Sequence, residues 1–160
     1  MDKREVIDFF KENRLFDNYE FIHEISPLMI KYIEFISESK DQEDFILLMF
    51  ALDDNTNLFE FTNVFIENIH CFYFNRNKKM FFEIFLHNIE IIYPHAIQMT
   101  RNILAPIIYD DNEARDFLYE SLCIVDEPKA KIFREIYLVM IQEDKKFYDD
   151  KIMSTLNFSS

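Results

Sequence analysis

The chain contains no glycine among its 160 residues. Average composition would supply about eleven in a chain of this length. Phosphate-binding loops, dinucleotide-binding turns and the nucleophile elbow of α/β-hydrolases all require glycine for backbone reasons. Two-residue β-hairpins also lose their preferred turn residue. The missing glycine therefore predicts an all-helical chain and excludes several common classes of enzyme.

Acidic side chains outnumber basic ones, with 30 Asp and Glu against 17 Lys and Arg, so the net charge is -13. Direct binding to a phosphate backbone requires clustered Lys and Arg, and we therefore expect no nucleic-acid contact. Acidity of this size favours a basic protein partner, or serves solubility alone.

The two cysteines, Cys71 and Cys123, are too few for a disulfide framework, and the charged residues 1–14 do not have the pattern of a signal peptide. No uncharged apolar run approaches the roughly 18 residues that span a bilayer. We therefore expect one cytoplasmic helical domain over residues 1–160, with no membrane association. Both cysteines are expected to be small core residues.

Apolar residues recur at helical spacing along the whole chain, which predicts eight or nine helices. Asp2 is a predicted N-cap, and Ser26 followed by Pro27 predicts the start of a second long helix. Pro94 is expected to begin another helix, which Pro106 should bend or end. The remaining helices are expected over residues 45–52, 57–72, 81–93, 114–122, 128–141 and 147–156.

Three phenylalanines, Phe45, Phe81 and Phe117, stand 36 residues apart both times, each in the first helix of a predicted hairpin. Helical hairpins with a period of about 33–47 residues are typical of tetratricopeptide and HEAT solenoids. No tetratricopeptide signature is present. The sequence therefore predicts HEAT-like stacked helical hairpins, an α-solenoid, with a globular helical bundle as the alternative. The predicted core comprises these three residues with Phe61, Phe65 and Phe133.

Two Glu-x-x-His pairs, Glu20 with His23 and Glu67 with His70, have the spacing found in di-iron carboxylate bundles. A helical wheel places both pairs away from the apolar stripes, so we expect no metal site. Cys71 directly follows His70, and adjacent residues do not face each other on a helix, which argues against a nucleophile and base pair. We therefore expect no catalytic residue, no cofactor and no enzymatic activity.

Acidic pairs recur at the predicted helix junctions. Aspartates at a helix start accept hydrogen bonds from free amides and stabilise the helix dipole. If stacked repeats bring these loops to one edge, the pairs also sum into a negative field. Both interpretations remain open for Asp53 and Asp54, Asp110 and Asp111, Asp126 and Glu127, and Asp149 and Asp150.

The polar sides of the second helices are expected to form one face of the stack, which is acidic over its N-terminal half. Concave faces of solenoids commonly bind partners. The predicted partner-binding residues are Glu34, Glu38, Asp53, Asp54, Glu60, Asn63 and Glu67.

These features favour an acidic inhibitor of a basic protein. Its most concrete form is a bacterial immunity protein that neutralises a cationic nuclease toxin by covering the nucleic-acid-binding surface. A nuclease cleft must be positive to hold phosphates, and a negative surface is steered toward it. The alternative is a viral Bcl-2-like modulator of host apoptosis or signalling, which would bind an amphipathic helix in an apolar groove. The partner's identity and the oligomeric state stay open.

Overall fold

A computed structural model describes residues 2–15, 22–56 and 59–157 of the chain, and the side chains of residues 22–24 and 59–61 lie outside this description. All regular secondary structure in the described ranges is helical. The elements are α1 (Lys3–Asn13), α2 (Ile22–Glu38), η2 (Gln42–Phe45), α3 (Ile46–Met49), α4 (Phe59–Asn75), α5 (Lys78–His87), η3 (Ile89–Ile91), α6 (Ile97–Asp110), α7 (Ala114–Leu122), α8 (Glu127–Glu143), η4 (Lys145–Phe147) and α9 (Asp150–Leu156).

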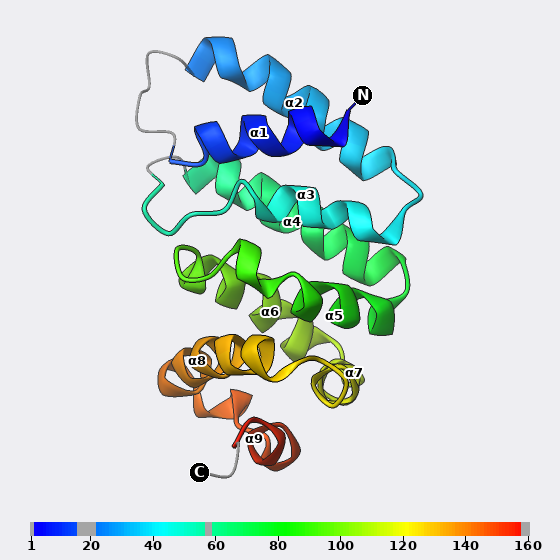
Figure 1. The fold of residues 1–160 in the computed structure, drawn as a ribbon, viewed down its shortest axis with the longest axis vertical. Coiled ribbons are helices and arrows are strands. Elements are labelled where there is room, and N and C mark those ends of the chain that lie inside the picture. Colours follow the sequence, from blue (N-terminus) through cyan, green and yellow to red (C-terminus); the bar gives the residue numbers. More distant parts are fainter. Residues whose placement is uncertain (1, 16–21, 57–58, 158–160) are drawn as a thin grey trace.

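The helices stack in chain order along the long axis of the molecule (Figure 1). In a first layer, α1 contacts α3, the η2 turn beside α3 contacts α5, α5 contacts α7, and α7 contacts α9. In a second layer, α2 contacts α4, α4 contacts α6, and α6 contacts α8. The predicted all-α class is confirmed. The stacking is compatible with a solenoid or a bundle of helical hairpins, and we assign it to no repeat class.

The cap predictions hold where a local signal decides the helix start. The Asp2 carboxylate accepts a hydrogen bond from the Arg4 N–H at the start of α1. The Asp126 carboxylate accepts one from the Lys129 N–H at the start of α8. Each of these bonds spans two or three residues, so it follows from the sequence without tertiary contacts.

The proline predictions hold less well. Ser26 and Pro27 lie inside α2 rather than at its start, and α6 begins three residues after Pro94. Pro106 does not end α6, which continues to Asp110. A proline inside a helix removes one hydrogen bond and crowds the preceding turn. Burial of the apolar faces of α2 and α6 offsets that cost, since most helix stability in proteins comes from packing.

The aromatic core is largely where the sequence places it. Phe45, Phe65, Phe81 and Phe133 are fully buried. The rings of Phe45 and Phe81 stack with centroids 4.6 Å apart, so two residues of the 36-residue series meet across the first layer. The side chain of Phe61 lies outside the described part of the chain.

Phe117, the third member of the series, is only partly buried, so its assignment to the core was wrong. The buried apolar positions of α7 are instead Ala114, Leu118 and Leu122, four residues apart. A helix turns about 100° per residue, so the side chain preceding Leu118 falls at the flank of that stripe. The spacing of 36 residues does not make Phe117 equivalent to Phe45 and Phe81.

The two cysteines are free and exposed, so the prediction that they lie in the core was wrong. In α4 the buried stripe runs through Phe65, Ile69 and Phe72. Cys71 is about 200° from Ile69 on the helical wheel and therefore points outward. No helix within the described ranges is long and apolar enough to cross a membrane.

Candidate functional site: the outer face of α2 and α4

Most of the predicted partner-binding residues lie on two adjacent helices of the second layer. Glu34 and Glu38 are exposed on α2, and Asn63 and Glu67 are exposed on α4. Glu60 also belongs to α4, but its side chain is outside the description. We define the α2–α4 face by the exposed side chains Ile30, Glu34, Glu38, Asn63, Val64, Glu67, Cys71 and Phe74.

This face is strongly negative. Helices α2 and α4 together contain five acidic residues and a single lysine, a net charge of -4. Neither helix has a basic residue in its last turn, so no side chain of that turn offsets the negative end of the helix dipole.

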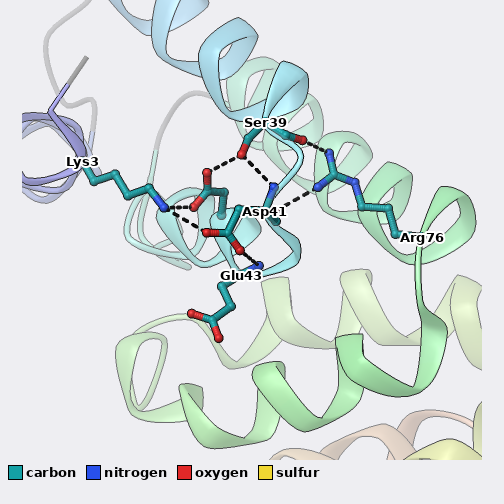
Figure 2. A network of polar contacts seen from close by, with 6 residues as sticks. Lys3, Ser39, Asp41, Glu43 and Arg76 are labelled. Carbon is teal, nitrogen blue, oxygen red and sulfur yellow. Dashed lines mark hydrogen bonds and ion pairs between the residues drawn. The ribbon is translucent and has the colours of Figure 1, made fainter.

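The C-terminal ends of α2 and α4 lie side by side. Arg76, which follows α4, donates hydrogen bonds to the backbone oxygens of Ser39 and Asp41, which follow α2. The same guanidinium lies 3.9 Å from the centroid of the Phe72 ring. Figure 2 shows Arg76 reaching across from the end of α4 to the connector after α2.

The connector after α2 is also bound to α1. Lys3 forms ion pairs with Asp44 and, at 3.3 Å, with Asp41 (Figure 2). The hydrogen bond from Lys3 to Asp44 raises the pKa of the Lys3 ammonium, and the backbone N–H of Glu43 lowers the pKa of Asp41. Asp44 is only 3% exposed, although it lies in a connector rich in charged residues. This network fixes the ends of α1, α2 and α4 relative to one another.

The carboxylates on the α2–α4 face have no counter-ion among the side chains that the structure describes. Glu34, Glu38 and Glu67 form no hydrogen bond or ion pair within the described residues. Their charge is therefore not compensated at short range, and it remains available to a basic group on another molecule.

Asp53, one of the predicted partner-binding residues, is not part of this face. Its side chain is buried, with 2% of the residue exposed. Its Oδ2 atom lies 3.3 Å from Arg14 Nε, and its Oδ1 atom accepts a hydrogen bond of 3.0 Å from the Asn55 N–H. A carboxylate held by these contacts is not accessible to a partner.

The carboxylate of Asp54 is also used for hydrogen bonds within the fold. It accepts hydrogen bonds from the backbone N–H groups of Gln98, at 2.9 Å, and Met99, at 3.0 Å. These are the free amides of the first turn of α6, whose own N-cap residue, Ala96, supplies no side-chain acceptor. Asp54 therefore caps a helix of the next hairpin, more than 40 residues away in the chain.

The acidic pairs do not gather at one edge of the stack. Asp53 and Asp54 contact the end of α1 and the start of α6, whereas Asp111 pairs with Lys78 at the start of α5 at 2.6 Å. Asp111 also accepts a hydrogen bond of 2.8 Å from the Tyr73 hydroxyl near the end of α4. The adjacent ammonium holds the pKa of Asp111 below its usual range. Successive loops of helical hairpins lie at alternate edges, which separates the pairs.

The capping interpretation of the acidic pairs is confirmed for several of them. Asp126 accepts from the Lys129 N–H, and Asp149 accepts from the N–H groups of Lys151 and Ile152. These aspartates therefore stabilise helix starts, whereas the described carboxylates of the α2–α4 face make no such contact.

Helices α6 and α8 also carry many charged residues, but their net charge is zero. Four acidic and four basic residues in these helices give zero. Arg101 of α6 pairs with Glu143 of α8, and Lys131 pairs with Glu127 at 2.9 Å. The Tyr93 hydroxyl donates to Glu135 at 2.5 Å, which raises the pKa of that tyrosine.

His70 does not point into solvent as the helical wheel predicted. Its Nε2 atom lies 2.8 Å from the backbone oxygen of Ile103 in α6, so the ring bridges two helices of the second layer. Glu67 of the same Glu-x-x-His pair is exposed, while the side chains of Glu20 and His23 are not described. Among the side chains that are described, no three His, Cys, Asp or Glu residues are grouped so as to hold a metal ion.

The exposed apolar residues of the face were missed by the sequence analysis. Ile30 is 51% exposed, Val64 38% and Phe74 42%. Each lies off the buried stripe of its helix, and a full helical wheel of α2 and α4 could have found them. No family model, curated protein or solved structure matches the chain.

Proposed function

We propose that this protein is an acidic inhibitor that binds a basic protein through the α2–α4 face. The observation that supports it is the set of exposed carboxylates of Glu34, Glu38 and Glu67, which form no ion pair within the described residues. The net charge of -13 adds a long-range field of the same sign. The proposal includes no catalytic step and no cofactor.

The most concrete partner is a cationic nuclease toxin, with the chain acting as its immunity protein. A nuclease holds phosphate groups with clustered Lys and Arg, so its cleft presents the complement of a face whose charged side chains are the carboxylates of Glu34, Glu38 and Glu67. Complementary charge accelerates encounter, and coverage of the cleft excludes the nucleic acid. Inhibition then results from occupying the substrate site of the nuclease. It requires only that the chain bind tightly and fit the shape of the cleft.

The test is a comparison of three baits expressed in the source organism. The first bait is the unaltered chain. The second carries Glu34→Lys and Glu67→Lys. The third carries Glu127→Lys and Glu135→Lys, which makes the same change of net charge at exposed positions of α8. Mass spectrometry identifies what each bait retains.

We expect a basic protein that the first and third baits retain and the second loses. Addition of the purified chain to that protein should abolish its nuclease activity at a stoichiometric ratio. Equal retention by all three baits would remove the α2–α4 face from the proposal. A retained protein that carries an amphipathic helix and has no nuclease activity would favour the Bcl-2-like alternative.

A further inference from the structure

We infer that the α2–α4 face is a docking furrow for a basic amphipathic α-helix of the partner. The inference rests on the proposed function and adds to it the kind of segment that is bound. It follows from the arrangement of apolar and acidic side chains about the line where α2 and α4 meet.

The line of contact between the two helices is marked by a hydrogen bond. Ser37 Oγ of α2 donates to the side-chain oxygen of Asn68 of α4. A hollow of about 120 Å³ at this point is lined by Ser37, Asn68, Cys71, Phe72, Asn75 and Arg76. The two helices therefore border a furrow that is open to solvent at this point.

Apolar side chains lie close to this line on both helices. At about 100° per residue, Ile30 is about 20° from Ser37 on the outer side of α2. On α4, Val64 and Cys71 are about 40° and 60° from Asn68. All three are exposed, so apolar side chains border the line of contact on both helices.

Carboxylates lie farther from the line, on both flanks. Glu34 and Glu38 are about 60° and 100° from Ser37 on α2. Glu67 is about 100° from Asn68 on α4. The line of contact is therefore bordered on both helices by apolar side chains and, farther out, by carboxylates, and its complement is an apolar stripe with basic residues on both sides.

A helix provides this complement with the correct spacing. Ile30 and Ser37 are seven residues apart, as are Val64 and Cys71, and seven residues extend about 10.5 Å along a helix. Two turns of a partner helix have the same length, so anchors at i, i+3, i+4 and i+7 can follow the furrow. A second copy of the chain does not offer this complement, because each copy carries a net charge of -13.

The test uses a synthetic 18-residue peptide of leucine and lysine, with the leucines on one helical face. The control peptide has the same composition in an order that gives no apolar helical face. Each peptide is titrated against the full chain by calorimetry at physiological salt, and amide chemical shifts map the contact. The protein variants are Ile30→Ser with Val64→Ser, and, as a matched pair of exposed apolar residues elsewhere, Met80→Ser with Ile124→Ser.

We expect the amphipathic peptide to bind with shift changes concentrated in α2 and α4. The Ile30→Ser, Val64→Ser variant should raise Kd at least ten-fold, and the Met80→Ser, Ile124→Ser variant less than about two-fold. Failure to bind, equal binding of the reordered peptide, or equal losses in both variants would overturn the inference.

The outcomes separate the inference from the proposed function. In one outcome, Glu34→Lys with Glu67→Lys releases the captured basic protein while the Ile30→Ser, Val64→Ser variant binds the peptide normally. This outcome supports the acidic inhibitor and contradicts the docking of a helix. If the peptide docks as expected but no basic protein is captured, the furrow stands and the inhibitor of a nuclease does not.

Discussion

The two halves of the second layer share one architecture and differ in how their charges are used. Helices α6 and α8 have no net charge, and Arg101 pairs with Glu143 across their boundary. Helices α2 and α4 have a net charge of -4, and Glu34, Glu38 and Glu67 have no counter-ion within the described residues.

The comparison shows that net charge alone does not locate a charged site. Elsewhere in the structure many carboxylates pair with Lys or Arg or accept helix amides, so their charge is used within the fold. Exposed pairs contribute only about 0–1 kcal/mol each, so stability does not demand them. Among the described side chains, the absence of counter-ions for Glu34, Glu38 and Glu67 is therefore tolerated, and it leaves these carboxylates available for binding.

The largest expected effect tests whether the N-terminal helices up to α4 and the helices from α5 onward share one hydrophobic core. Phe81 of α5 stacks on Phe45 of the N-terminal half and lies 5.3 Å from the Tyr73 ring, centroid to centroid. Phe81→Ala should lower the free energy of unfolding by about 3–5 kcal/mol in urea denaturation followed by circular dichroism. Phe117→Ala should cost clearly less because Phe117 is only partly buried. Two separate transitions would show that the halves unfold independently.

The second prediction concerns the unpaired charges directly. Between low salt and about 0.15 M, the association rate constant with the captured partner should fall roughly ten-fold, because screening weakens steering. Stopped-flow fluorescence measures this rate constant. Reversal of Glu34, Glu38 and Glu67 to lysine should remove most of the salt dependence. If reversal of Glu127 and Glu135 removes as much, the field is a property of the whole chain and the comparison of faces fails.

The third prediction is a difference in stability between paired and unpaired charges. Arg101→Gln breaks an ion pair between α6 and α8, in which both side chains are about one-third exposed, and should lower the free energy of unfolding by about 0.5–1 kcal/mol. Glu34→Gln should change it by less than about 0.5 kcal/mol, and toward greater stability, because it removes charge from a strongly acidic chain. A loss of stability at Glu34 equal to that at Arg101 would reveal an internal role for this glutamate.

The smallest expected effect is the pH dependence of stability caused by His95, which lies between α5 and α6. Burial, with the Arg14 guanidinium, lowers the pKa of His95, while Asp53 and Asp54 oppose the shift. The unfolded chain therefore binds the proton more readily below about pH 6.5, and stability should fall as pH decreases through that range. The urea midpoint should fall more between pH 7.5 and 5.5 in the unaltered chain than in His95→Gln. Identical losses in both would show that other groups carry the pH dependence.

Much of the fold could be predicted because its determinants are local. The caps at Asp2 and Asp126, and the burial of Phe45, Phe65 and Phe81, follow from signals within one or two helical turns. The exposed carboxylates of α2 and α4 were predicted in the same way, from positions opposite an apolar stripe.

The sequence by itself determined an all-helical chain and the exposed positions of Glu34, Glu38 and Glu67 opposite the apolar stripes of their helices. Only the tertiary structure decided that Asp53 is buried against Arg14, and that Asp54 caps α6 from another hairpin. It also decided that Arg101 has a partner in Glu143, while Glu34 has none in the described part of the chain. The physical reason is distance along the chain: helical periodicity and N-caps act over a few residues, whereas these contacts join groups about 40 residues apart, and only the packing of the layers brings such groups together.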